Sequence, residues 1–92
     1  MAKCRRRVQY LGHVQGVGFR ARARMIASRH AVAGWVRNLD DGGVELVVEG
    51  EESVVLRFLD EVARDLGRYI AGVEATDEVP TDPPDAGFVI RY

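Results

Sequence analysis

The chain has 92 residues, 47% of them apolar, which suffices for one small domain with a two-layer core. This length excludes a doubly wound dinucleotide-binding fold, a barrel enzyme and any enzyme whose cleft lies between two domains. The formal net charge is −1, but residues 1–37 carry nine basic and no acidic residues, whereas residues 38–92 carry four arginines and all fourteen acidic residues. This asymmetry predicts an anion-binding face, for a nucleic acid or for a smaller anion.

Cys4 is the only cysteine, so no disulfide can form within the chain and a reducing compartment is the simpler expectation. The first ten residues lack the apolar run of a signal peptide, and no stretch approaches eighteen apolar residues. We therefore expect a cytoplasmic protein without a membrane partner. Cys4 has no histidine and orienting partner near it in sequence, so we interpret it as an incidental thiol and not as a nucleophile.

The first half of the chain predicts a strand, a loop, a helix and a second strand. Residues 6–11 alternate loosely between polar and apolar side chains and predict the first strand. Residues 12–18 (GHVQGVG) predict a glycine-rich loop, and residues 19–30 place apolar side chains at helical spacing without a proline. Residues 33–38 predict the second strand. His30, at the end of the predicted helix, is expected to be a C-terminal cap.

The next elements are a hairpin, a third strand and a second helix. Residues 41–43 (DGG) predict the turn of a hairpin, and residues 44–49 then alternate as a third strand. Apolar side chains at helical spacing predict a helix over residues 55–66, with Ser53 as a candidate cap and Gly67 as its stop.

The end of the chain predicts two further strands. Residues 73–79 predict the fourth strand, the three prolines within residues 80–85 require a loop, and residues 88–92 predict a short last strand. The order βαββαβ plus a short C-terminal strand predicts an α+β fold, a ferredoxin-like two-layer α/β sandwich in which two helices cover one face of an antiparallel sheet. We expect residues 1–92 to form a single domain. Because this fold hosts many functions, the function must be inferred from a site.

The loop between the first strand and the first helix is a candidate anion site. Gly16 and Gly18 allow successive N–H groups to turn inward, and the following helix adds unpaired N–H donors and the positive end of its dipole. Arg20 lies in the first helical turn, where a cation opposes the helix dipole but could share an anion with the loop. Taken alone, the loop fits an ordinary glycine turn equally well, and Arg20 a surface residue. The spacing Gly16-x-Gly18-x-x-Ala21 also imitates a dinucleotide fingerprint, which the short chain argues against.

Asn38 ends the predicted second strand, directly before the hairpin turn. The alternation places Val36 and Asn38 on one face of the strand and Trp35 and Arg37 on the other. In isolation, the simpler interpretation is a turn asparagine that accepts a backbone hydrogen bond. The functional interpretation is an amide whose donor and acceptor hold a water molecule in one orientation.

These two segments together resemble the acylphosphatase family. The family motif G-x-V-Q-G-V-x-F-R is present as residues 12–20 (GHVQGVGFR), and the motif G-W-V-x-N as residues 34–38 (GWVRN). The closing residues 88–92 (FVIRY) are also similar to the last strand of the family, so that the resemblance spans about residues 7–92. Two residues depart from the family pattern. Tyr10 replaces an aliphatic residue and is expected to pack inward, and Ala31 replaces a common glycine, which costs about 1 kcal/mol if that site needs a positive φ.

The resemblance implies the hydrolysis of acyl phosphates, which are carboxyl–phosphate mixed anhydrides, to a carboxylate and inorganic phosphate. It implies Arg20 and Asn38 as the catalytic residues and a phosphate-binding loop made of Gln15, Gly16, Val17, Gly18, Phe19 and Arg20. Loop N–H groups and Arg20 hold the phosphate, and Asn38 orients a water for direct in-line attack, without a metal or other cofactor. The leaving carboxylate is weakly basic and needs no general acid, so positioning and charge stabilisation remain. The expected partner is a small acyl phosphate, with inorganic phosphate or sulfate as a competing ligand, and the expected state is a monomer.

Other functions stay open at this point. A sheet of this fold can bind RNA, but the predicted third strand carries acids and no stacking aromatic residue, so no nucleic-acid partner is expected. A third possibility is a domain that serves a larger carbamoyl-phosphate-processing protein, such as the hydrogenase maturation factors, although those carry cysteine-rich zinc motifs. His13 flanks the loop, but the family tolerates other residues at this place, and we expect no catalytic role for it.

Overall fold

The computed structural model describes residues 2–81 and 86–92. Its elements follow one another in the predicted order. They are β1 (Lys3–Gly12), α1 (Phe19–Ala27), β2 (Val32–Asn38), β3 (Val44–Glu51), α2 (Glu52–Leu66), a single 3₁₀ turn η1 (Gly67–Tyr69), β4 (Ile70–Glu78) and β5 (Phe88–Ile90). Of the predicted proline-rich loop, residues 80 and 81 have no regular structure, and 82–85 lie outside the described residues.

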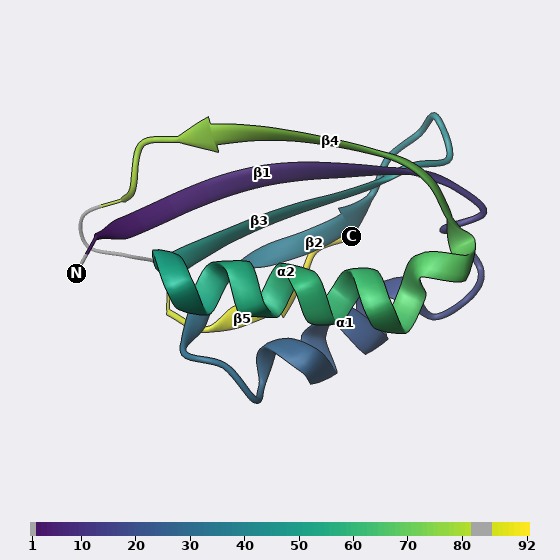
Figure 1. Cartoon of the computed structure of the whole chain (residues 1–92). Helices are drawn as coiled ribbons and strands as arrows, with labels where there is room; N and C mark the ends of the chain where they lie inside the picture. Colours follow the sequence, from purple (N-terminus) through teal and green to yellow (C-terminus); the bar gives the residue numbers. More distant parts are fainter. Residues whose placement is uncertain (1, 82–85) are drawn as a thin grey trace.

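The five strands form one sheet in the order β4-β1-β3-β2-β5, and both helices lie on the same face of it (Figure 1). Neighbouring strands are antiparallel except at the edge, where β5 runs parallel to β2. The prediction of an antiparallel sheet is therefore wrong at this edge, and the sheet is mixed. The reason is topological: β4 and β5 lie on opposite edges of the sheet, and β5 begins at the end of the sheet where β4 ends, which is also the end where β2 begins. The ferredoxin-like α+β fold itself is confirmed.

The core lies between the sheet and the two helices. Each helix buries one stripe of side chains, and the odd-numbered and even-numbered positions of the strands separate into an open face and a core face. Tyr10 packs inward as expected, with its ring centroid 5.0 Å from that of Phe19. Full burial of each large apolar side chain contributes roughly 1.5–3 kcal/mol to this core. The core side chains include Val8, Tyr10, Phe19, Ile26, Val36, Leu46, Val48, Phe58 and Val62.

Two predicted helix caps differ in the structure. The side chain of His30 does not cap α1, since its Nε2 lies 2.9 Å from Oε1 of Glu61 on α2, although its backbone N–H donates to Ala27 O, at the end of the helix, at 3.0 Å. The N-cap of α2 is Glu51, and Ser53 only donates a hydrogen bond from its Oγ to the Glu51 carboxylate at 3.3 Å. A carboxylate thus engages each side chain: that of Glu61, from another element, at His30, and that of the nearby Glu51 at Ser53.

Two further expectations concern Gly67, at the end of α2, and Ala31, which precedes β2. Gly67 ends α2 as predicted, but its φ of −56° is right-handed, and the chain continues into η1 before β4 begins. Within residues 2–81 and 86–92 every residue with a positive φ is a glycine. Ala31 therefore adopts an ordinary backbone conformation, and the strain considered for it is absent.

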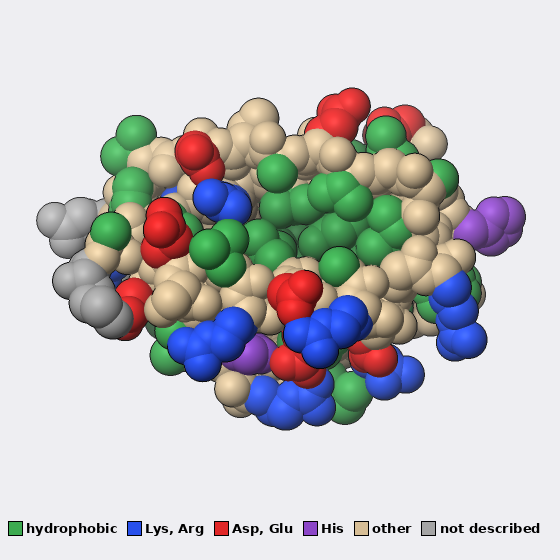
Figure 2. Space-filling view, in the orientation of Figure 1, with side chains coloured by type: hydrophobic (Ala, Val, Ile, Leu, Met, Phe, Trp, Pro, Cys, Tyr) green, Lys and Arg blue, Asp and Glu red, His purple; other side chains and the backbone are tan. Residues whose placement is uncertain are grey.

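The helices leave the β4 side of the sheet uncovered. Figure 2 shows hydrophobic side chains in the space between β4 and α2. Val73 of β4 is 55% exposed and Leu56 of α2 is 44% exposed. The same view shows Lys and Arg next to Asp and Glu along the lower side of the molecule. No helix in the described part of the chain has the length and apolar character needed to span a membrane.

Candidate active site

A hollow of about 200 Å³ lies where the loop between β1 and α1 meets the ends of β2 and β5. Arg20 and Asn38, the two predicted catalytic residues, both line it, although they come from a helix and a strand that are separate in sequence. The parallel pairing of β5 with β2 explains how the C-terminus reaches this place, since both strands end on the same side. The hollow is lined by Val14, Gly16, Gly18, Phe19, Arg20, Ala21, Asn38, Ile90 and Tyr92.

The loop depends on two glycines for its backbone conformation. Gly16 and Gly18 have φ values of +77° and +79°, and a Cβ at either position would meet no atom within 4 Å. The requirement is therefore for the left-handed backbone and not for space, and alanine would cost about 1 kcal/mol at each site. Gly18 is also the N-cap of α1 and offers no side-chain acceptor.

The N-terminus of α1 points its unpaired donors at the hollow. The first helical hydrogen bond runs from Arg22 N to Gly18 O at 3.0 Å. The N–H groups of the three preceding residues, 19–21, therefore come before the helical ladder and have no partner within it. Together with the positive end of the helix dipole, these donors form a setting that favours an anion.

Arg20 is held against an aromatic ring instead of an acid. Its Cζ lies 4.9 Å from the ring centroid of Tyr92, and among the described residues no ion pair to Arg20 is found. Tyr92 is placed by the backbone, since Arg91 N donates to Val36 O at 2.9 Å and so continues the pairing of β5 with β2. Stacking on the ring orients the guanidinium and leaves its N–H donors available to a ligand.

Gln15 joins the two halves of the site through its side chain. Its Nε2 donates to the carbonyl oxygens of Leu39 at 2.7 Å and Gly43 at 2.8 Å, across the hairpin that follows Asn38. Only the loop backbone was predicted to act at this position, so the side-chain bonds are new information from the structure. They fix the distance between the loop and the end of β2, where Asn38 is exposed at the rim of the hollow.

Some predicted residues are not brought to the hollow, and others were missed. Gln15 and Val17 of the predicted loop do not line the hollow, and Val17 packs against the core. His13, for which no role was expected, is exposed, and its backbone N–H donates to Tyr69 O at 2.9 Å. Ile90 and Tyr92 line the hollow but were predicted only as strand positions. Their alternation was visible in the sequence, but which end of which strand they would reach depended on the parallel pairing of β5.

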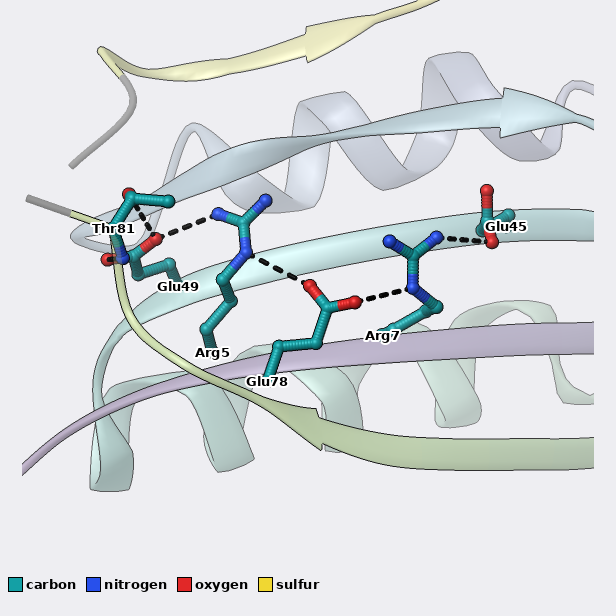
Figure 3. Close-up of polar contacts among 6 residues, drawn as sticks. All are labelled: Arg5, Arg7, Glu45, Glu49, Glu78 and Thr81. Atoms are coloured by element: carbon teal, nitrogen blue, oxygen red, sulfur yellow. Dashed lines mark hydrogen bonds and ion pairs between the residues drawn. The ribbon is translucent and has the colours of Figure 1, made fainter.

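Arg5 and Arg7 of β1 are paired with acids on the open face of the sheet, the face opposite the helices. Figure 3 shows a row in which Arg5 lies between Glu49 and Glu78, and Arg7 lies between Glu78 and Glu45. The nitrogen–oxygen distances along this row are 2.8, 3.1, 2.6 and 2.6 Å. Cationic side chains of the basic half of the chain thus neutralise acids of the acidic half across the sheet.

Burial and hydrogen bonds act in opposite directions on these acids. Burial of Glu45 and Glu49 raises their pKa values, but hydrogen bonds from arginine, and from Thr81 to Glu49, outweigh burial and hold both pKa values below the ordinary range. The pKa of Glu78 is lowered mainly by its hydrogen bond with Arg7. All three carboxylates therefore stay charged and engaged at neutral pH.

Trp35 is covered by arginines on the same open face. The guanidinium carbons of Arg7, Arg37 and Arg91 lie 5.8, 5.2 and 4.7 Å from its ring centroid, and only 6% of the residue is exposed. Arg37 also donates to Glu45 at 2.8 Å. The ring is therefore closed to a stacking base, which extends the sequence argument against RNA binding.

Cys4 and the acidic residues offer no alternative site. Burial raises the pKa of the Cys4 thiol, and the nearby positive charge of Arg6 offsets this only in part, which agrees with an inert thiol. Within the described ranges, no three His, Cys, Asp or Glu side chains converge in a way that could hold a metal ion.

Comparison with known proteins places this geometry in context. The family model described as Acylphosphatase matches residues 6–90. An acylphosphatase of Roseiflexus sp. is 46% identical, over 100% of this chain and 99% of that protein. The crystal structure of acylphosphatase from Bacillus subtilis superposes with a TM-score of 0.84 at 32% identity, covering 97% of this chain and 99% of that one. HypF of T. kodakarensis is similar over 98% of this chain but only 12% of its own, with a TM-score of 0.78 and 30% identity.

Proposed function

The chain belongs to the acylphosphatase family, and we propose that it hydrolyses small acyl phosphates at the hollow between the β1–α1 loop, Asn38 and Tyr92. The observation that carries this proposal is the convergence of Arg20 and Asn38, one from each family motif, on one hollow beside an open helix N-terminus. We place the enzyme in the cytoplasm as a monomer, with inorganic phosphate or sulfate as competing ligands.

The phosphate of the substrate is held by the loop and Arg20. The left-handed glycines Gly16 and Gly18 allow the N–H groups of residues 15–20 to converge on one anion, and the helix dipole adds to their field. The guanidinium of Arg20 donates two parallel hydrogen bonds to two phosphate oxygens, a geometry that an ammonium group cannot copy. The lack of an ion pair to Arg20 among the described residues supports this assignment, since its charge is left for a ligand.

A water molecule held by the side-chain amide of Asn38 attacks the phosphorus atom. The water oxygen forms a bond to phosphorus while the bond from phosphorus to the acyl oxygen breaks, and the carboxylate leaves with the bonding electron pair. The proton of the water passes to the phosphate or to solvent. Arg20 and the loop N–H groups stabilise the charge on the equatorial oxygens in the transition state, and the step uses no metal and no general acid.

The test is turnover of benzoyl phosphate, acetyl phosphate and carbamoyl phosphate by the purified protein with EDTA present. We expect hydrolysis that EDTA does not reduce and that inorganic phosphate inhibits competitively. Absence of hydrolysis above background for all three substrates would contradict the proposal. Loss of activity with EDTA that is restored by a divalent cation would contradict the metal-free step.

A further inference from the structure

A second hollow, of about 530 Å³, lies beside the candidate active site along α1. Ala21 lines both hollows, and both lie between α1 and the chain of β5 and its end, with Phe88 in the second and Ile90 in the first. We call the two together the α1–β5 groove. A substrate whose phosphate occupies the first hollow can therefore extend its acyl part into the second.

Arg24 is the charged side chain that the second hollow presents. It follows Arg20 by four residues, so the two side chains lie on the same face of α1, about 5–6 Å apart at their Cβ atoms. Arg24 is exposed, and neither an ion pair nor a hydrogen bond joins its side chain to another described residue.

The other arginines near α1 are engaged by acids of α2. Arg22 lies 3.4 Å from Asp65, and Arg29 pairs with Glu61. Of these four arginines, the two without an acid among the described residues are Arg20 and Arg24, and both line the groove. A random arrangement of these arginines, or one set by mutual repulsion, would not require the two without an acid to be the two that line the groove.

The remaining walls of the second hollow are apolar or already hydrogen-bonded. Met25 and Phe88 are apolar, Ser28 donates its hydroxyl to Met25 O, and His30 is bonded to Glu61. One unengaged cation among such walls fits a ligand group with an apolar body and an anionic end.

We propose that Arg24 binds a second anionic group, a carboxylate or a phosphate, on the acyl part of the substrate. This inference rests on the proposed function and names its substrate class: acyl phosphates with a second negative charge about 5–10 Å, or one to two helical turns, from the reactive phosphate. The competing explanation is that Arg24 only complements the negative end of the dipole of α1. That explanation predicts no dependence on the charge of the acyl group.

The experiment compares two substrates of similar size, 4-carboxybenzoyl phosphate and 4-methylbenzoyl phosphate, at low ionic strength. The measured quantity is the ratio of their kcat/KM values, in which any effect of a variant on folding cancels. We expect Arg24→Gln to lower this ratio about tenfold, as loss of one charge-assisted hydrogen bond implies. Arg24→Lys should retain most of the ratio, and 4-phosphonobenzoyl phosphate distinguishes a phosphate from a carboxylate site.

The matched control is Arg22→Gln, which removes the same charge from the same helix outside the groove. An equal fall of the ratio in this variant, or an unchanged ratio in Arg24→Gln, overturns the proposal. Binding of 4-carboxybenzylphosphonate and 4-methylbenzylphosphonate, measured by calorimetry, repeats the comparison without turnover. A binding ratio that depends on Arg24 in a protein without hydrolase activity would support the groove and contradict the proposed function, so the two can fail separately.

Discussion

The arginines of the open sheet face and those of the α1–β5 groove carry the same group in opposite settings. Arg5 and Arg7 each lie between carboxylates at 2.6–3.1 Å, on a surface where Glu49 is almost fully buried. Arg20 and Arg24 line hollows, and no acid among the described residues pairs with them. The number of charges in the sequence does not distinguish these two groups of arginines, but their contacts in the structure do. The first group stabilises the fold, and the second is available to a ligand.

The largest expected effect tests the ligand side of this comparison. Arg20→Lys keeps the charge but loses the bidentate fork, and we expect kcat/KM for benzoyl phosphate to fall about 10²–10³-fold, the cost of one transition-state donor. The free energy of unfolding should change by less than about 0.5 kcal/mol, as for a surface residue. Steady-state kinetics and urea denaturation check both values, with Arg22→Lys as the control. Kinetics close to those of the wild type would contradict the proposed pair of hydrogen bonds from Arg20 to the phosphate.

The converse change should act on stability alone. Glu49→Gln removes the carboxylate that accepts from Arg5 and from Thr81 N and Oγ1, at 2.8, 2.9 and 2.8 Å. We expect a loss of about 3 kcal/mol in the free energy of unfolding, because the charge-assisted hydrogen bonds to this nearly buried carboxylate are lost, although Arg5 keeps its pairing with Glu78. The kcat per folded molecule at 25 °C should stay within twofold. A large fall in kcat with unchanged stability would mean that the open face takes part in catalysis.

Asn38→Ala separates attack from binding within the site. Loss of the amide that orients the water should lower kcat about 30-fold, or about 2 kcal/mol, which is within the range of one oriented polar group. The inhibition constant of inorganic phosphate should change less than threefold, since Arg20 and the loop hold the phosphate. The reverse pattern, weaker phosphate binding with normal kcat, would assign Asn38 to binding.

Low pH should weaken the ion pairs on the open face of the sheet and lower the free energy of unfolding. The folded pKa values of Glu45, Glu49 and Glu78 lie below the unfolded value of about 4.3, so their contribution is complete above that value and is lost as the pH falls through the folded values. We expect a level free energy of unfolding between pH 6 and 8 and a decline below about pH 5, by roughly 1–2 kcal/mol at pH 4. Urea denaturation across this range measures it. The decline should be shallower in Glu49→Gln, and an equal slope would assign it to other groups.

Gln15→Ala should give the smallest effect and show whether the loop and hairpin depend on each other. Loss of the two hydrogen bonds to Leu39 O and Gly43 O should cost about 1 kcal/mol of stability. It should also lower kcat severalfold by releasing Asn38 from its position, while Gln15→Glu, which keeps the length but loses the donors, should behave like Ala. If kcat stays normal while stability falls, the bond is only structural.

The sequence predicted most elements because their patterns were local. The stripes of α1 and α2 and the alternation of Val44, Leu46 and Val48 lead directly to the core face of each element. The direction of β5 was not predicted, because three residues carry no signal of which neighbour they pair with. The side-chain cap expected at His30 was wrong because Glu61 comes from another element, whereas Ser53 bonds Glu51, which lies two residues away and is itself the N-cap of α2.

The candidate site shows the same division between local and distant information. The loop glycines and Arg20 follow from the motif and from the physical demands of an anion, and the structure places Arg20 with Asn38 at one hollow. Three other features depend on which groups the fold brings near one another. They are the two hydrogen bonds from Gln15 to the hairpin, the contact of Arg20 with the ring of Tyr92, and the lack of an acid paired with Arg24 among the described residues. These contacts join residues that are distant in the sequence, so no single position predicts them.

The place of β1 in the sheet also decides the order in which the molecule can be completed. The strand that comes first in this sequence lies inside the sheet, where Tyr10 pairs with Val44 on one side and Arg5 pairs with Glu78 on the other. β1 can pair with β3 once residues 44–51 are present, but with β4 only once residues 70–78 are present. Sheet contacts between such distant residues favour folding in milliseconds to seconds, slower than in helical bundles. The carboxylate of Glu78 that joins Arg5 to Arg7 belongs to β4, the later of the two partners of β1 in the sequence, so the ionic row can be complete only once β4 is in place.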